Sequence, residues 1–459
     1  MFDELIKKIN ETTNSNELKN LLSDLHQFDI AEILTQIDDE KKLMQILSLF
    51  NNEDLADILS YLDPSSATKF FEILDAHKAA DIINEMEVDD AFDIIDEMEK
   101  EDVEEIKEFL DKDTIEDLKI VAKYDDDTAG ALMNPNFVKI LSGSSLKEAM
   151  KELTRVAPSV ETINTLFIVN NNDELLGVLD LKKLIVSRMP LTVDDIMLEN
   201  FAYASVFDSI SDAIKLVQDY DTIALPVLNG KVIEGIITMD DAMDAYTKES
   251  EEDYAQFAGL TTDEEKNESI FSSVKKRLPW LSILLVLDII IALVISSFEN
   301  VISKLTILTF FQAAVLGLSG NTGTQALAVT VRNLANGKND KDELWKLILR
   351  EIGEGLGTAI ILGIVSFAFV FLMLIFQNKL GIANNEQSMI LNVGLVLGLS
   401  VLISVFCSNI VGTILPIFFY KIKIDPAVAS GPFITTINDV LSILIYFGTA
   451  LIVMSNYLS

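Results

Sequence analysis

Five long apolar segments in residues 275–459 constrain the fold more than any other feature of the chain. Each has the roughly 20 residues that a helix needs to cross the hydrocarbon core of a bilayer. No water is available there to bond backbone N–H and C=O groups, so each segment is expected to be a helix. The expected spans are 279–300, 306–331, 350–376, 388–418 and 427–455.

The charge of the chain is concentrated outside these spans. Hydrophobic residues make up 49% of the sequence, yet the net charge is −37. Residues 1–270 have 23 basic and 62 acidic side chains, a net of −39, whereas the rest of the chain is nearly neutral. An acidic soluble part therefore precedes a membrane part. So much negative charge needs counter-ions, and it excludes nucleic acid as a partner because phosphates would be repelled.

The sequence also indicates an orientation in the cytoplasmic membrane. The first residues, MFDELIKKINETTN, lack the apolar core of a signal peptide. Basic residues gather before the first span, between the second and third, and between the fourth and fifth. By the positive-inside rule the N-terminus is expected in the cytosol and the C-terminus outside. Cys407 is the only cysteine, so no disulfide can form within one chain.

Residues 1–123 predict an all-α, acidic domain. Related blocks such as IAEIL, LADIL, AADII and AFDII recur, each with an apolar helical face. Such repeated units cannot bury their faces alone, so we expect them to stack into a superhelix. Most of the acids are typical of a solvated face. Asp89 and Asp93 are different, because like charges four residues apart on a helix repel unless a cation intervenes.

Residues 124–200 and 201–246 predict two α/β modules. The second copy has a helix, a strand at 223–228, a turn at Asn229-Gly230 and a strand at 232–238. The first copy repeats this pattern more loosely from Ser145. The pair resembles tandem CBS motifs, which often sense ligands in enzymes, channels and transporters.

An acidic connecting helix is expected over residues 247–274, joining the second module to the first span. Five acids there and just before it fit one helical face: Asp241, Asp244, Glu249, Glu252 and Asp253. A solvated tether is the alternative interpretation, and further acids follow at Asp263, Glu264 and Glu265. The position between the sensing modules and the membrane favours a coupling role.

The last span carries a charged residue, Asp439, near its middle. A carboxylate at membrane depth costs at least about 2.5–3.5 kcal/mol, so it usually faces a bundle interior or a water-filled path. Gly431, Thr435, Asn438 and Ser442 recur with it at three- and four-residue spacing, which gives one polar helical stripe. Hard cations such as Mg2+ prefer oxygen ligands of this kind. The alternative is a structural aspartate that is hydrogen-bonded to a neighbouring helix.

The second span contains the run GLSGNTGTQ at 317–325. Small residues allow helices to approach closely in lipid. Asn321 and Gln325, four residues apart, would add amide oxygens to a candidate pore wall. Asp288 lies well inside the first span, and its sequence context does not decide whether it faces protein or water.

These motifs together resemble the MgtE family of magnesium channels and transporters over nearly the whole chain. The most specific matches are RLPW at Arg277–Trp280, LGLSGNTGTQ at Leu316–Gln325 and DPAVASGP…NDV…IYF at Asp425–Phe447. The resemblance implies a multidomain, multi-pass homodimer that serves magnesium homeostasis. Its pore would lie on the two-fold axis, lined mainly by the second and fifth spans.

The resemblance also implies sites. Asp439 matches the pore carboxylate, which holds Mg2+ largely through water, and Thr435 and Gly431 belong to the same stripe. Cytosolic Mg2+ would bind the acidic regions and close the pore. Ser209 and Ser211 stand where acids are expected, and ATP is a further candidate ligand of the CBS modules. Matching regulatory positions are Asp89, Asp93, Asp221, Asp241, Asp244, Glu249, Glu252 and Asp253.

Three other functions compete with this interpretation. A carrier for Co2+ or Mn2+ is compatible with an oxygen-lined pore. A membrane enzyme is disfavoured, because the two histidines, His26 and His77, lie in the acidic helical domain and no Ser/His or phosphate-loop constellation is present. A receptor without transport is disfavoured by Asp439 in its polar stripe.

Overall fold

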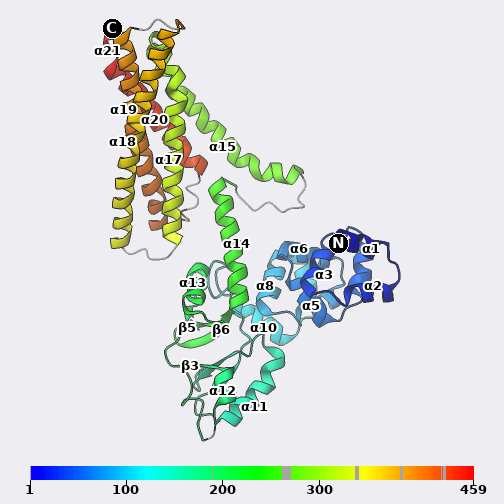
Figure 1. The fold of residues 1–459 in the computed structure, drawn as a ribbon. Helices are drawn as coiled ribbons and strands as arrows, with labels where there is room; N and C mark the ends of the chain where they lie inside the picture. The colour runs from blue at the N-terminus through cyan, green and yellow to red at the C-terminus, as the bar shows by residue number, and fades with distance from the viewer. Residues whose placement is uncertain are drawn as a thin grey trace. The chain divides into compact units, whose positions relative to one another are not determined.

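The computed structural model describes residues 2–188, 190–260, 270–335, 341–382, 386–424, 426 and 431–458. Asp263, Glu264, Glu265 and Asp425, which the sequence analysis singled out, lie outside these ranges. The chain divides into two compact units, Met1–Tyr246 and Thr247–Ser459. Figure 1 shows the elements of each unit.

The first part of the Met1–Tyr246 unit is helical, as predicted. Its helices are only 8 to 10 residues long. Asn14, Asp39, Asn51 and Asp75 each precede a helix, and each side chain accepts a hydrogen bond from a backbone N–H of the first turn. The helices are α1 (Phe2–Glu11), α2 (Ser15–Leu22), α3 (Gln27–Leu34), α4 (Glu40–Leu47), α5 (Asn52–Ser60), α6 (Pro64–Glu72), α7 (Ala76–Ile83), α8 (Val88–Glu97), α9 (Lys100–Lys107) and α10 (Lys112–Val121).

Alternate helices of this part pack on one another. Helix α3 contacts α5, α5 contacts α7, and α7 contacts α9, while α6 contacts α8. Their apolar faces meet in one core, in which Ile33, Leu55, Ile58 and Ile82 are almost completely buried. The recurring apolar blocks of the sequence therefore form a continuous interior, and the acids remain outside it.

Two α/β modules follow, as predicted. Each has a three-stranded sheet in which the first two strands are parallel and the last two antiparallel. The first module contains β1 (Lys139–Leu141), α11 (Leu146–Val156), η1 (Ala157–Ser159), β2 (Thr165–Val169), β3 (Leu175–Asp180) and α12 (Leu181–Val186). The second contains β4 (Ala204–Ser205), α13 (Ile210–Tyr220), β5 (Ala224–Asn229) and β6 (Val232–Thr238).

Helix α14 (Met239–Ala258) starts directly after β6. It is 20 residues long and continues across the division between the two units at Tyr246. The acids Asp240 and Asp241 occupy its first turn. Carboxylates are favourable at the N-terminal end of a helix dipole, so this acidic start agrees with local helix electrostatics.

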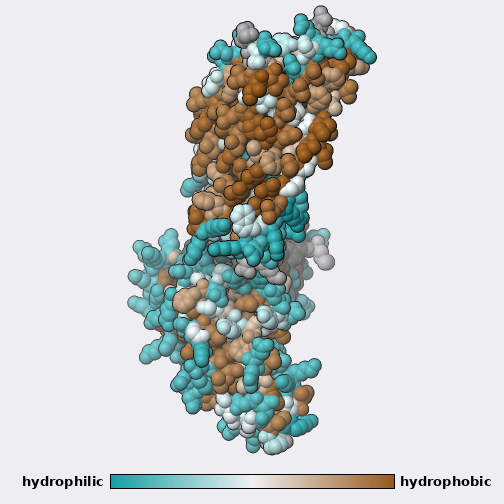
Figure 2. Space-filling view, turned by 90° about the vertical axis from the view of Figure 1, so that its left-hand side faces the viewer, coloured by the Kyte–Doolittle hydropathy of each residue, from teal (hydrophilic) through white to brown (hydrophobic). Residues whose placement is uncertain are grey.

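The Thr247–Ser459 unit is a bundle of long helices. After the end of α14 it contains α15 (Ile270–Ser296), α16 (Glu299–Lys304), η2 (Thr306–Leu308), α17 (Thr309–Ala335), α18 (Lys341–Lys379), α19 (Gln387–Lys421), α20 (Gly431–Val453) and α21 (Ser455–Leu458). Four of them, α15, α18, α19 and α20, are both long and apolar enough to cross a membrane. Figure 2 shows hydrophobic residues gathered on the surface of the long helices.

The expected span at 306–331 corresponds to η2 and α17. Helix α17 has 27 residues but is not among the four candidates, because the GLSGNTGTQ run makes it more polar. It packs against both α19 and α20. A Cβ atom on Gly323 would lie 2.0 Å from Asn438 Nδ2, and one on Gly412 would lie 2.3 Å from the Gly323 carbonyl oxygen. Glycine is thus required where these three helices cross.

Candidate metal centres

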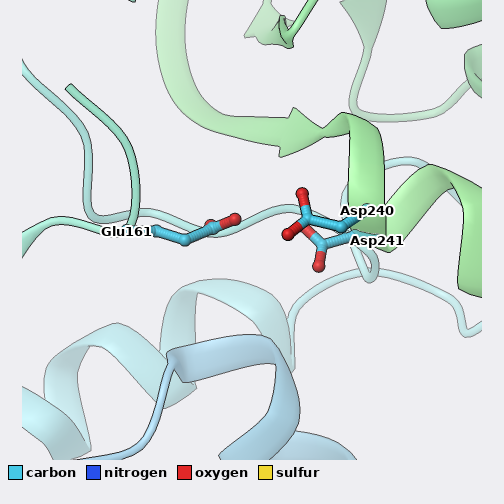
Figure 3. A group of neighbouring side chains, drawn as sticks. All are labelled: Glu161, Asp240 and Asp241. Atoms are coloured by element: carbon cyan, nitrogen blue, oxygen red, sulfur yellow. The ribbon is translucent and has the colours of Figure 1, made fainter. Parts of the chain in front are cut away.

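Three carboxylates from two segments converge within the Met1–Tyr246 unit. Asp240 and Asp241 lie in the first turn of α14, and Glu161 lies in the loop between η1 and β2 (Figure 3). One oxygen of each lies within 4.8 Å of the others. Thr238 holds Asp241 in place by donating from its Oγ1, at 2.5 Å, and from its backbone N–H, at 3.3 Å.

Acids from the N-terminal helices reach the same place. The Asn134 side-chain amide donates to Glu161 at 3.1 Å, to Glu87 at 3.0 Å and, more weakly, to Asp89 at 3.5 Å. Glu87 precedes α8, and Asp89 and Asp90 lie in its first turn. We refer to Glu87, Asp89, Asp90, Glu161, Asp240 and Asp241 as the acidic cluster.

The electrostatics of the acidic cluster oppose full ionisation. Burial raises the pKa of Glu87 to about 9 and that of Glu161 to about 7, and neighbouring carboxylates add to both shifts. Burial likewise raises the pKa of Asp90 to about 6 and the pKa values of Asp89 and Asp241 above their ordinary value. Glu161 contributes to the raised pKa of Glu87, so the two side chains favour at least one bound proton when no cation is present. A divalent cation would replace such protons and satisfy the same oxygens.

The structure brings together some of the regulatory residues that the sequence singled out. Asp89 and Asp241 belong to the acidic cluster, while Asp93 and Asp244 act electrostatically on Asp90. Asp221 is the exposed C-cap of α13, in a left-handed conformation. Three others, Glu249, Glu252 and Asp253, lie farther along α14, with Glu252 exposed.

Sequence reasoning missed Glu87, Asp90, Glu161 and Asp240 as members of this cluster. The run Glu87-Val-Asp-Asp90 could have indicated these residues, because three acids lie together at the start of one helix. Glu161 gave none, since it is a single acid in a loop and only the tertiary fold places it beside α14.

A second candidate site lies in the Thr247–Ser459 unit, where a cavity of ≈ 580 Å³ contains Asp439 in its wall. The side chain of Asp439 is half-buried. We call this space the Asp439 cavity. It is lined by Tyr254, Phe257, Ala258, Leu284, Asp288, Thr324, Gly431, Pro432, Thr435, Thr436 and Asp439.

Hydroxyl groups line the cavity close to the carboxylate. Thr435 donates to the Gly431 carbonyl at 2.9 Å, and its Oγ1 lies 3.5 Å from Thr324 Oγ1. The predicted stripe residues Gly431, Thr435 and Asp439 therefore share one wall. Asn438 and Ser442 are instead fully buried against other helices, and Ser442 donates to Ser319 at 2.6 Å. Asn321 and Gln325 are exposed on α17 and do not line the cavity.

Comparison with known proteins identifies the family. Residues 312–449 match a model described as a divalent cation transporter, MgtE; residues 25–127 match the MgtE intracellular N domain; residues 129–188 and 193–248 match CBS domains. The chain is 35% identical to the magnesium transporter MgtE of Bacillus subtilis over 72% of its own length and 71% of the relative's. It is 37% identical to the Enterococcus faecalis protein over 72% and 70%, respectively.

The chain belongs to the MgtE family of magnesium transporters. Solved structures agree: the soluble part of a magnesium transporter has a TM-score of 0.51 and 27% identity, covering 55% of this chain and all of that one. The cytosolic domain of the Mg2+ channel MgtE in complex with ATP has a TM-score of 0.50 and 29% identity, covering 53% of this chain and all of that one.

Family membership confirms the resemblance seen in the sequence. This MgtE protein is a magnesium transporter and not an enzyme, and Mg2+ is its transported ion. It is a multi-pass membrane protein with a cytosolic N-terminal region. The predictions of magnesium transport, CBS domains and transmembrane helices are thus confirmed.

The raised pKa values of the acidic cluster predict that Mg2+ and pH act together on stability. A carboxyl whose pKa is higher in the folded than in the unfolded chain favours the folded state less as pH rises. Without Mg2+, stability should therefore fall between pH about 4.5 and about 9, the ordinary and raised values for Glu87. Thermal unfolding of the purified full chain at pH 5, 7 and 9 measures this loss.

Added Mg2+ should reverse the loss, and more strongly at higher pH, because fewer protons then compete with the ion. A Mg2+ concentration about 100 times the Kd should raise the Tm by roughly 5–10 °C. Glu161→Gln should reduce that increase, whereas Glu101→Gln, at an exposed acid in α9, should not. An equal Mg2+ effect in both variants would show that the cluster binds no ion.

Proposed function

We propose that Mg2+ crosses the membrane past Asp439. The observation that carries this proposal is the Asp439 cavity, whose wall contains Asp439 together with the hydroxyl-bearing residues Thr324, Thr435 and Thr436. Mg2+ gives up its water reluctantly and is usually bound with several waters retained. Hydroxyls and a carboxylate at the edge of a water-filled space suit such an ion, since they can contact its hydration shell without replacing it.

We infer that α17 is the fifth membrane span. Its 27 residues would extend about 40 Å as a helix, which exceeds the roughly 30 Å hydrocarbon core. A relatively polar helix is tolerated in a membrane when other helices or water cover its polar face. Five spans with a cytosolic N-terminus place the C-terminus on the extracytoplasmic side.

We also propose that the active protein is a homodimer. Asn321 and Gln325 are exposed on α17, on a helix that the proposal places in the membrane. Exposed amides facing lipid would be costly, whereas amides facing a second copy across a two-fold axis would line a shared pore. The dimer therefore accounts for the two candidate pore-wall residues that the single chain leaves uncovered.

We propose that the acidic cluster and α14 regulate transport in response to cytosolic Mg2+. At low cytosolic Mg2+, repulsion among Glu87, Asp89, Glu161 and Asp241 favours separation of α8 from the start of α14. At high Mg2+, ions bridge the carboxylates and favour the closed arrangement. Such a ligand shifts the equilibrium only by its difference in affinity for the two states. Asp93, Asp221, Asp244, Glu249, Glu252 and Asp253 are proposed to contribute further weak sites.

Two other ligands follow from the comparisons and the chemistry. A related cytosolic domain is crystallised with ATP, and we extend nucleotide binding to the CBS modules of this chain as a secondary proposal. An oxygen-lined path also admits other divalent ions, so Co2+ or Mn2+ is the alternative cargo. Competition of each ion with Mg2+ in a flux assay separates these possibilities.

Neutralising Asp439 should stop transport. Asp439→Ala removes the one carboxylate that α20 offers to the cavity, so uptake of Mg2+ into proteoliposomes should fall at least about tenfold. Thr449→Ala, on the same helix but outside the cavity, is the control. Rescue of a magnesium-requiring strain gives a second measurement. Normal uptake by a correctly inserted Asp439→Ala protein would place the ion path elsewhere.

Assembly is tested by mass. Light scattering of the protein in detergent, corrected for bound detergent, should give two copies of the 50.9 kDa chain. Replacing Asn321 and Gln325 with leucine should leave the dimer intact but reduce uptake, because the amides are proposed to line the pore rather than to hold it together. A monomer that transports Mg2+ at the same rate would contradict a shared pore.

Closure by cytosolic Mg2+ is tested by a triple substitution in the acidic cluster, Glu87→Gln with Asp89→Asn and Asp241→Asn. Because bridging ions lose their ligands, the variant should stay open at a Mg2+ concentration several times that which closes the native channel. Matched changes of exposed Glu97, Glu101 and Glu105 to glutamine are the control. Single-channel recording with Mg2+ varied on the cytosolic side measures the threshold, and an unchanged threshold would rule out regulation here.

A further inference from the structure

A second carboxylate, Asp288, belongs to the wall of the Asp439 cavity. It lies inside α15, in the apolar run LVLDIIIALV, which is one of the four helices able to cross a membrane. At that depth a charged side chain is costly unless it faces protein, a partner charge or water. The sequence could not decide which of these applies; in the structure Asp288 is exposed and lines the Asp439 cavity.

The placement follows from the helix geometry. Leu284 and Asp288 are four residues apart on α15, and both line the cavity. Across the cavity, α20 contributes Thr435 and Asp439 at the same spacing. Among the described residues that line it there is no lysine, arginine or histidine to neutralise either acid.

We propose that Asp288 is a second carboxylate of the ion path, which draws hydrated Mg2+ toward Asp439 and favours divalent over monovalent cations. The proposal rests on the proposed function, since it takes the Asp439 cavity as part of that path. It assigns a direct role in choosing the ion to α15, a helix that the sequence analysis did not place in the pore.

The size and charge of the cavity support this role. Six waters around one Mg2+ occupy roughly 180 Å³, at about 30 Å³ each, and the cavity has ≈ 580 Å³. The ion can thus enter with its first hydration shell, so both acids act through water. Two negative charges beside one space repel each other, and a divalent ion between them relieves that repulsion more effectively than K+ or Na+.

The test uses the full-length protein in proteoliposomes and compares Asp288→Asn with the native chain. Loss of one of two charges should raise the half-saturating Mg2+ concentration roughly fivefold, and it should lower the permeability of Mg2+ relative to K+. Asp288→Glu, which keeps the charge, should behave like the native protein. Glu299→Gln in α16, an acid outside the cavity, is the matched control and should change neither quantity.

The outcomes separate this proposal from the proposed function. If Asp439→Ala stops uptake while Asp288→Asn matches Glu299→Gln, the path is correct and the role of Asp288 is overturned. If Asp439→Ala transports normally, the path itself is wrong. A purely structural role for Asp288 would lower expression and the maximum rate without shifting the Mg2+/K+ permeability ratio, which would also overturn the proposal.

If Asp288→Asn inserts poorly into the membrane, a cysteine variant provides an alternative test. Cys407 is the only native cysteine, so Asp288→Cys in a Cys407→Ser background offers one thiol. An anionic methanethiosulfonate should label it from water and restore Mg2+ uptake, whereas a neutral reagent of similar size should not. Mg2+ should slow the labelling. A thiol that water-soluble reagents cannot reach, or equal effects of both reagents, would contradict a position in the ion path.

Discussion

A bilayer offers no hydrogen-bond partners, and this constraint shapes the whole helical unit. Helix α20 carries polar groups that must be enclosed by other helices, and glycines make the enclosure close enough. Asn438 is completely buried against Gly323, where any larger residue would overlap its amide. Asp439 is the next residue and so lies about 100° further around the helix, in the wall of the cavity. The tight contact on one face of α20 thus fixes which of its residues line the cavity.

The Met1–Tyr246 unit has a different electrostatic feature. It holds several partly buried carboxylates close together, although like charges repel one another. Burial and mutual repulsion raise the pKa values of Glu87 and Glu161 well above the ordinary range. Repulsion among the carboxylates destabilises the cluster when it is ionised and empty, and binding of protons or of a cation would relieve that repulsion. A cluster of this kind suits the proposed sensing role, since its stability would depend on the concentration of a cation that it binds.

Helical periodicity, charge segregation and turn chemistry were enough to predict the acidic helical domain, the paired α/β modules and four of the five expected apolar spans. Asp439 was recognisable because charge is rare within an apolar run. Glu161 was not, since its partners are far away in sequence and only the packing of α8, the η1–β2 loop and α14 reveals them. The depth of Asp288 was visible in the sequence, but which face of α15 met protein depended on the way that α15 packs on α20. The relatively polar α17 marks a further limit, because whether such a helix can lie in a membrane depends on the helices that cover its polar face, which hydropathy does not take into account.

Helix α14 connects the two kinds of site within one element. Its first turn supplies Asp240 and Asp241 to the acidic cluster, and its last turns supply Tyr254, Phe257 and Ala258 to the lining of the Asp439 cavity. A helix transmits a displacement along its axis because each turn is hydrogen-bonded to the next. Under the proposed regulation, an ion that draws Asp241 toward Glu161 would act on the same helix that supplies Tyr254 and Phe257 to the cavity. On this proposal, a helix break introduced between Asp244 and Tyr254 should separate Mg2+ binding from closure.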